Sequence, residues 1–234
     1  MAQNSNENVQ RFGAWAGPIS LGIWIIVLWP LTHYIPPPAP TLTTPQVVAL
    51  YAGNSSAIRI ASMLILMAIA FTTVFYAAIS AQIRRMEGDA PVWTYAQMLN
   101  GLLSLVGFVT IAILWAASAY RPERSPEIIQ AFHDESWLLY SMVAPPAFMQ
   151  CIAVGFAVLG DKNPIAIFPR WLAYLSIWTG ILFLPGALAC LFKTGPFAWN
   201  GLFAFWIPLS VFGLWVFVMC WAMLKAAARP RAFN

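Results

Sequence analysis

The chain has 234 residues, of which 61% are hydrophobic and only 9% carry a charge. Roughly a quarter of the residues of a soluble domain are charged, so this composition excludes a water-soluble fold and predicts an integral membrane protein. The formal net charge of +4 comes from scattered residues and not from a basic run or face, which excludes a nucleic-acid partner and leaves the lipid bilayer.

The beginning of the chain is polar and then becomes strongly apolar. Residues 1–10 are rich in Ser, Asn and Gln, and we expect them to form a disordered leader. A first spanning helix is predicted over about 12–34, since a hydrocarbon core of roughly 30 Å needs about 20 helical residues. Pro30 should bend the far end of this helix, because proline has no N–H to donate.

A short helix is predicted after the proline-rich stretch 35–40. Thr44 followed by Pro45 is typical of a helix start, with a capping residue and then a proline in the first turn. The helix would continue through Tyr51. Because it is too short to cross a bilayer, we expect it to be interfacial or re-entrant.

Five further apolar segments are each long enough to span. They are expected over about 57–85, 92–120, 126–159, 169–191 and 199–224. The fourth spanning helix exceeds the membrane thickness, so its first two turns should project, and Pro145-Pro146 must interrupt its hydrogen-bond ladder. The predicted fold is an all-α bundle of six transmembrane helices, one domain over 11–228 with a tail at 229–234.

The distribution of basic residues predicts the orientation of the bundle. The side that holds both termini carries Arg11, Arg84, Arg85, Lys162, Arg170, Lys225, Arg229 and Arg231. The other side carries Arg59, Arg121, Arg124 and Lys193. Since Lys and Arg are retained in cytoplasmic loops, the leader, the tail and both termini are predicted to be cytoplasmic.

Ionisable residues are missing from the middle of the predicted spans. A charge at that depth costs at least roughly 2.5 kcal/mol and is kept only for function, so a proton-coupled pump or a voltage sensor is excluded. The deepest polar candidate is Gln150, just after Pro145-Pro146. It either joins neighbouring helices by hydrogen bonds or lines a pathway.

Polar residues gather instead at the helix ends on the side opposite the termini. The candidate binding residues at these helix ends are His33, Arg59, Gln130, His133, Asp134, Glu135 and Asn200. The deeper Gln150 is the eighth candidate. Three interpretations of this cluster stay open: a solvated rim, a binding or entrance site, and a metal site. The metal site would use His33, His133 and either Asp134 or Glu135, although no HxxxH or HxxE spacing supports it.

Arg59 is placed one turn into its helix, deep enough to need a partner. We expect an ion pair with Asp134 or Glu135, and the alternative is that its side chain reaches up to lipid headgroups.

Motifs of the common enzyme classes are missing from the sequence. HExxH, GxSxG, P-loop and GxGxxG patterns do not occur, and two histidines are too few for a membrane di-iron oxygenase. We therefore predict no cofactor, and an enzyme is the less expected class.

Three segments carry a resemblance to other proteins. They are Thr44–Asn54, the stretch from Arg121 to Trp137, and Lys193–Asn200. They resemble segments of uncharacterised bacterial multi-spanning membrane proteins, and the likeness covers most of the chain. The resemblance implies a protein of the bacterial inner membrane and implies no substrate.

Three hypotheses for the function follow from these observations. The first is a channel, facilitator or transporter for a small uncharged or amphipathic solute, with proline breaks supplying unwound backbone. The second is a non-catalytic subunit that docks with itself, as a homo-oligomer, or in a larger membrane complex. The third is a membrane enzyme or cofactor protein built on His33, His133, Asp134 and Glu135.

Overall fold

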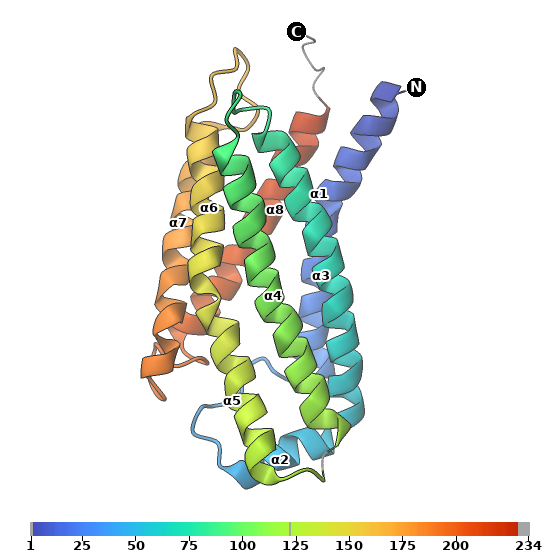
Figure 1. Ribbon diagram of the computed structural model, residues 1–234, viewed down its shortest axis with the longest axis vertical. Coiled ribbons are helices and arrows are strands. Elements are labelled where there is room, and N and C mark those ends of the chain that lie inside the picture. The colour runs from blue at the N-terminus through green and yellow to red at the C-terminus, as the bar shows by residue number, and fades with distance from the viewer. Residues whose placement is uncertain (1, 122, 229–234) are drawn as a thin grey trace.

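The computed structural model describes residues 2–121 and 123–228, and all the regular structure in these ranges is helical. Six helical segments are long and apolar enough to cross a membrane, which confirms the predicted all-α class with six spans (Figure 1). The spans are Glu7–Leu31, Ser55–Ile83, Val92–Tyr120, Pro126–Leu159, Arg170–Leu191 and Leu202–Ala227. The single exception to the up-and-down pattern is the short helix α2 (Thr44–Gly53).

The first and last helices define one end of the bundle. The helix α1 (Ala2–Ile26) begins and α8 (Ile207–Ala227) ends at the same end, as an even number of spans requires (Figure 1). We call this the terminal end. The opposite end, which we call the α2 end, holds α2 and the loops that follow α4 (Val92–Tyr120) and the fifth span.

The helix α1 begins at Ala2, so it includes residues 2–10 of the segment that we predict as a disordered leader. A salt bridge of 2.9 Å between Glu7 and Arg11 stabilises one turn, since residues four apart lie on the same helix face. Gln10 also accepts a hydrogen bond of 2.9 Å from Gln82 of α3 (Ser55–Ile83). Local composition favoured a coil, and these contacts favour the helix. The predicted tail at 229–234 lies outside the described residues.

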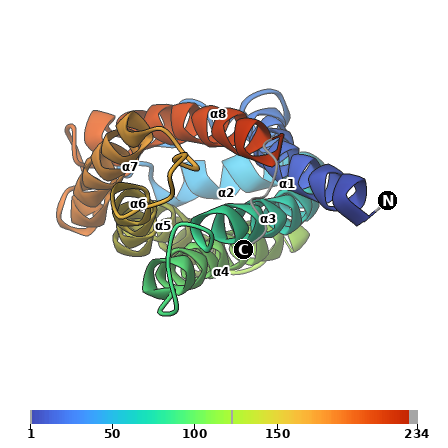
Figure 2. The same ribbon diagram turned by 90° about the horizontal axis from the view of Figure 1, so that it is seen from above.

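The short helix α2 lies across the α2 end of the bundle (Figures 1 and 2). Its capping residue is Thr43, so the helix begins one residue earlier than a Thr44 cap would place it. The Gln46 side-chain oxygen accepts hydrogen bonds from the Thr43 N–H at 2.8 Å and from the Thr43 hydroxyl at 3.0 Å. Val47 and Tyr51, four residues apart, are buried. One face of α2 therefore closes the bundle, and its position relative to a membrane surface stays a prediction.

Several spans are interrupted at or near a proline, as the sequence predicts. The fourth span divides at Val143 into α5 (Pro126–Met142) and α6 (Ala144–Leu159), with both prolines of Pro145-Pro146 in the first turn of α6. Proline is tolerated there because first-turn N–H groups have no partner within the helix.

The other interruptions replace α-helix by tighter or wider turns. The first span ends in the π-helical turn Val27–Leu31 around Pro30. The fifth changes from α7 (Arg170–Phe183) to the 3-10 helix η2 (Leu184–Leu191), and the sixth begins as the π-helix η3 (Leu202–Trp206) before α8. Such turns often mark functional positions in helices.

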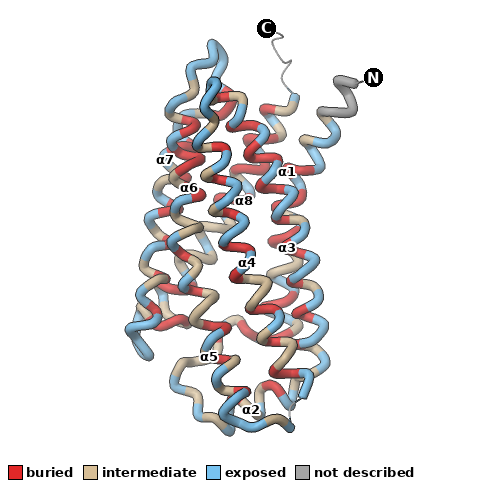
Figure 3. Tube along the Cα trace, viewed as in Figure 1, coloured by how far each residue is buried: buried red, intermediate tan, exposed pale blue. Residues whose placement is uncertain are grey.

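The outer surface of the bundle is apolar. Exposed positions run along the outward sides of the helices, and buried ones face the neighbouring helices (Figure 3). The exposed side chains include Leu99, Leu103, Ile113, Trp178 and Phe217. Large apolar side chains on the outside of six spanning helices fit an integral membrane protein surrounded by lipid.

Candidate functional site

A cavity of about 110 Å³ lies inside the bundle, beside Gln150. Its wall is mostly apolar and includes the polar side chains of Tyr76, Ser104, Tyr140, Ser141 and Gln150, with no Asp, Glu, Lys, Arg or His among the lining residues. A second cavity of about 80 Å³ adjoins it, because Tyr76, Phe108, Tyr140, Leu209 and Phe212 line both. We call the first of these the central cavity.

Three of the interrupted spans meet at the central cavity. Its wall includes Val143, where α5 ends, Gly186 of η2, and Ala204 of η3. An interrupted helix leaves backbone groups outside the regular ladder, and membrane transporters place such breaks where their solutes bind. The three breaks therefore lie around one cavity, although they are far apart in the sequence.

Gln150 places an amide group on the wall of this cavity, and the amide nitrogen has no hydrogen-bond partner there. The side chain is buried, and its amide Nε2 has no hydrogen-bond partner among the described residues. A Cβ atom at Gly101 would lie 2.8 Å from this Nε2 and 2.7 Å from the Tyr76 ring, so the missing side chain at 101 makes the room for both. The amide is thus held in place by packing beside Gly101 and Tyr76.

A row of similar polar atoms runs along α5 toward the central cavity. The buried atoms without a hydrogen-bond partner include Gln130 Oε1, His133 Nε2, Trp137 Nε1 and Ser141 Oγ. Spacings of three and four residues place these side chains on one broad face of a helix. We call these four the polar row; it begins near α2 and ends at Ser141, which lines the cavity.

Unsatisfied buried groups are costly, which makes their alignment informative. A buried donor or acceptor without a partner costs about 1–3 kcal/mol, and most native structures contain few of them. Four on one helix face, continued by Gln150 Nε2 at the cavity, indicate a line of polar sites that a hydrogen-bonding molecule could occupy in turn.

Packed aromatic rings surround the polar row at the α2 end. Trp137 is in contact with the rings of Tyr34, Trp115, His133, Tyr140 and Phe205, at centroid distances from 5.4 to 6.5 Å. We call these six rings, together with Tyr51 and Trp199, the aromatic cluster. Tyr140 also lines the central cavity, so the cluster begins where the cavity ends.

Hydrogen bonds fix parts of the aromatic cluster. The Trp115 indole N–H donates to Ser136 Oγ at 2.9 Å, and that hydroxyl donates to the His133 carbonyl oxygen at 2.8 Å. Trp199 donates to the carbonyl oxygen of Pro38 at 2.8 Å and thereby joins two loops of the α2 end. The cluster is therefore a packed and partly hydrogen-bonded layer between α2 and the cavity.

Two tyrosines of the cluster, both outside the spans, remain neutral over the physiological range. Burial raises the pKa of the Tyr34 phenol well above its ordinary value, and the neighbouring Tyr51 adds to this effect. Burial likewise raises the pKa of Tyr51. Removing a phenolate from water is unfavourable, so both side chains serve as neutral hydrogen-bonding groups.

The structure brings together half of the eight predicted site residues. Gln130 and His133 belong to the polar row, and Asp134 accepts a hydrogen bond of 2.9 Å from Gln130 Nε2. Gln150 lines the cavity at which the row ends. His133 is 1% exposed, so it does not belong to a solvated rim.

The other four predicted residues lie apart from the row. His33 and Glu135 are exposed, and Asn200 is half-buried in the loop before η3. His33 has a left-handed backbone with φ of 57°, which turns the chain out of the first span. Arg59 lies on an outer groove described below.

The ion pair predicted for Arg59 is wrong. Among the described residues Arg59 forms no ion pair with Asp134 or Glu135, and its guanidinium instead lies over the Tyr120 ring, 5.2 Å from its centroid. Arg59 is exposed on α3, next to the buried Ile58, and so it points away from the bundle interior that α5 helps to form.

The metal site considered for His33, His133, Asp134 and Glu135 is also not formed. Within the described part of the chain, no three or more His, Cys, Asp or Glu side chains are grouped so that they could hold a metal ion. An exposed His33 and a buried His133 explain why this ligand set does not assemble.

Sequence reasoning missed Tyr34, Tyr51, Trp115, Trp137 and Ser141 as site residues. Tryptophans and tyrosines near segment ends are typical of membrane–water interfaces, so their type gave no reason to place them inside the bundle. Ser141 could have been found, because it shares a helix face with Gln130 and Asp134.

Comparison of the chain with protein-family models, with curated proteins and with solved structures finds no match. The resemblance to bacterial multi-spanning membrane proteins therefore stays a prediction.

Proposed function

We propose that this chain is a facilitator or transporter that carries a small, uncharged, hydrogen-bonding solute across the membrane, with the central cavity as its binding chamber. The polar row is the observation that carries the proposal. Its four unpartnered buried atoms lead from the α2 end to the cavity, where Gln150 Nε2 offers a further donor. A solute could exchange hydrogen bonds along this line.

The cavity limits the solute in size and charge. An apolar protein cavity of about 150 Å³ binds benzene, so a chamber of about 110 Å³ suits a molecule of a few heavy atoms. A charged solute would meet no countercharge on this wall and would have to lose its hydration, which is costly at membrane depth.

The aromatic cluster acts as the closed gate in this proposal. All of its rings except the half-buried Tyr140 are buried, and they pack between α2 and the cavity, so passage requires them to separate. The breaks at Val143, Gly186 and Ala204 give three spans a point about which they can bend.

We place the protein in the bacterial inner membrane with both termini in the cytoplasm. The supporting observations are the excess of Lys and Arg on the side of the termini and the resemblance of the chain to bacterial proteins. A reporter enzyme active only in the cytoplasm, fused to the C-terminus, tests the orientation; a silent fusion would reverse it.

The proposal is tested by measuring solute flux into liposomes that contain the purified full-length protein. Stopped-flow light scattering after a hypertonic step with urea, acetamide or glycerol reports how fast each solute enters. We expect faster entry of at least one of these solutes than in empty liposomes. Equal rates for all three would contradict the proposal.

Two variants connect the flux with the cavity. Ala147→Phe adds a ring to a residue that lines the cavity and should abolish the accelerated entry, and Gln150→Met should reduce it by removing the amide. Ala70→Phe, at an exposed position on α3, is the matched control and should keep the flux. Equal flux in the wild-type, Ala147→Phe and Gln150→Met proteins would exclude the central cavity as the chamber.

A further inference from the structure

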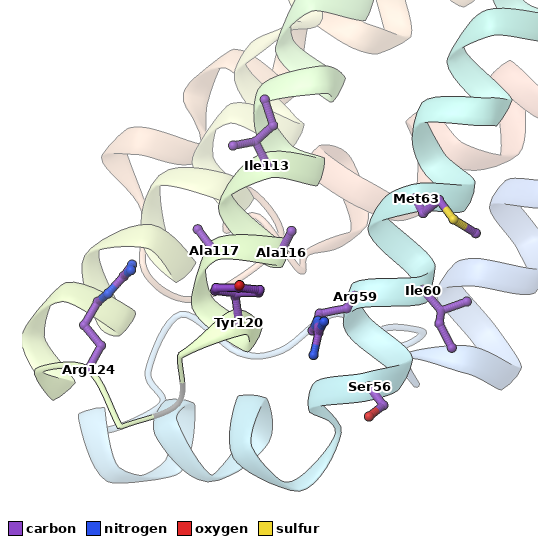
Figure 4. A pocket seen from close by; sticks show the side chains of 9 residues that line it. All are labelled: Ser56, Arg59, Ile60, Met63, Ile113, Ala116, Ala117, Tyr120 and Arg124. Carbon is purple, nitrogen blue, oxygen red and sulfur yellow. The ribbon is translucent and has the colours of Figure 1, made fainter.

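An open groove of about 760 Å³ lies on the outer surface between α3 and α4, at the α2 end (Figure 4). The α3 side is formed by Ser56, Arg59, Ile60 and Met63, and the α4 side by Ile113, Ala116, Ala117 and Tyr120. Arg124, in the loop that follows α4, completes the lining. The small side chains of Ala116 and Ala117 leave the groove hollow between the two helices.

The groove is charged at one end and apolar along its length. Arg59, Arg124 and Ile60 lie near the end of the bundle, and Met63 and Ile113 continue the groove toward the middle of the spans (Figure 4). Ile60, Met63 and Ile113 are 49, 58 and 57% exposed. A ligand that fits must be anionic at one end and apolar at the other.

Aromatic rings hold both arginines while their charges stay unneutralised. The Arg59 guanidinium lies 5.2 Å from the centroid of Tyr120, and that of Arg124 lies 5.6 Å from the centroid of Phe132. Neither side chain takes part in an ion pair or a side-chain hydrogen bond among the described residues. Cation–π contacts position a guanidinium over a ring face and leave its N–H groups free to donate.

We propose that this groove is a binding site for an anionic phospholipid. The headgroup phosphate accepts hydrogen bonds from Arg59 and Arg124, because the planar guanidinium matches the geometry of a phosphate oxygen pair. One acyl chain lies along Ile60, Met63 and Ile113. The site is on the lipid-facing surface and is independent of the central cavity.

Charge and shape together favour a lipid over a free phosphate. Two arginines alone would suit either ligand, but a free phosphate would leave the apolar length of the groove uncovered. The lining residues of α3 and α4 lie within two of the membrane spans, so an acyl chain is the ligand that surrounds them in a bilayer.

The test is a titration of the purified full-length protein in detergent, with bound lipid counted by native mass spectrometry. The probes are phosphatidylglycerol and phosphatidylcholine with identical acyl chains, and glycerol 3-phosphate as the soluble headgroup. We expect phosphatidylglycerol to bind roughly tenfold more tightly than phosphatidylcholine, because the choline cation of phosphatidylcholine offsets the charge of its phosphate and is repelled by the two guanidinium groups. Glycerol 3-phosphate should not compete in the same concentration range.

Four variants assign the site. Arg59→Gln and Arg124→Gln should each weaken phosphatidylglycerol binding by about fivefold or more, since each removes one charged donor. Arg121→Gln is the matched control, because it removes the same charge from an exposed residue of the same loop that does not line the groove, and it should change binding by less than about twofold. Arg59→Lys keeps the charge and should retain part of the affinity.

Three results would overturn the proposal. Equal binding of the two lipids would remove the role of charge, and an equal loss in Arg121→Gln would show diffuse attraction to basic residues instead of a site. Full competition by glycerol 3-phosphate would show an anion site that does not use the apolar groove. Thermal unfolding of each variant, recorded beside the titration, separates lost binding from lost fold.

Discussion

The hydroxyl of Tyr51 lies 3.3 Å from Nδ1 of His133, inside the α2 end of the bundle. Tyr51 belongs to α2 and His133 to α5, and both side chains are buried. Their rings also meet edge to face, with centroids 5.8 Å apart. A polar contact and a ring contact thus hold α2 across the bundle, directly beside the polar row.

Tyr51→Phe should destabilise the protein by about 1 kcal/mol, because it removes this hydrogen bond and leaves a second nitrogen of buried His133 without a partner. Thermal or denaturant unfolding of the purified protein in one detergent measures the change. Tyr95→Phe, which alters a ring that is 54% exposed, is the matched control and should have almost no effect. Equal losses in the two variants would contradict the importance of the Tyr51 contact.

Trp115 and Ser136 should be energetically coupled, since the indole N–H of Trp115 donates to the serine hydroxyl at 2.9 Å between α4 and α5. Trp115→Phe alone also loses ring area, so the bond is isolated by a double-mutant cycle with Ser136→Ala. We expect a coupling energy of about 1 kcal/mol in the free energy of unfolding. Additive effects of the two substitutions would show that the bond contributes nothing.

The six spans and their interruptions could be predicted because they depend on local sequence. Apolar length determines a transmembrane helix, and a proline interrupts the ladder wherever it stands inside one. Pro145-Pro146 therefore located the division of the fourth span at Val143 to within a few residues. The helix α2 could be predicted from Thr44 and Pro45 for the same reason.

The candidate site depends on which face of each helix points inward, and this could not be predicted. In a soluble helix the polar face marks the outside, whereas both faces of these spans are apolar because one of them meets lipid. Arg59 was therefore paired with Asp134 or Glu135 across the bundle, although it lies on the outer face of α3. For His133 the sequence likewise left a solvated rim open beside a binding site and a metal site, and the burial of its side chain excludes the rim.

Gln150→Met should leave the stability of the fold unchanged or raise it slightly, in contrast to its proposed effect on flux. Its Nε2 has no partner, so an apolar side chain of similar shape removes an unsatisfied group instead of a bond. Gln97→Met is the matched control, because the Gln97 side-chain oxygen accepts a hydrogen bond from Ser80, and it should cost about 1 kcal/mol or more. Unfolding in detergent measures both; a loss above about 2 kcal/mol in Gln150→Met would make its amide structural.

Stability should fall in alkaline solution through Tyr34 and Tyr51. Burial raises the pKa of both phenols above the ordinary value of 10.0, so above about pH 10 the unfolded chain releases protons that the folded chain still holds. The unfolded state then binds fewer protons, so the free energy of unfolding falls by up to about 1.4 kcal/mol per pH unit for each group. Below pH 10 both states are protonated, and the two tyrosines add no pH dependence. Unfolding of the purified protein between pH 8 and about pH 11 measures the slope. The free energy of unfolding of the Tyr34→Phe/Tyr51→Phe double variant should fall less steeply with pH than that of the wild type, and Tyr95→Phe is the exposed control. An unchanged slope in the double variant would show that these two phenols ionise as readily in the folded protein as in the unfolded chain.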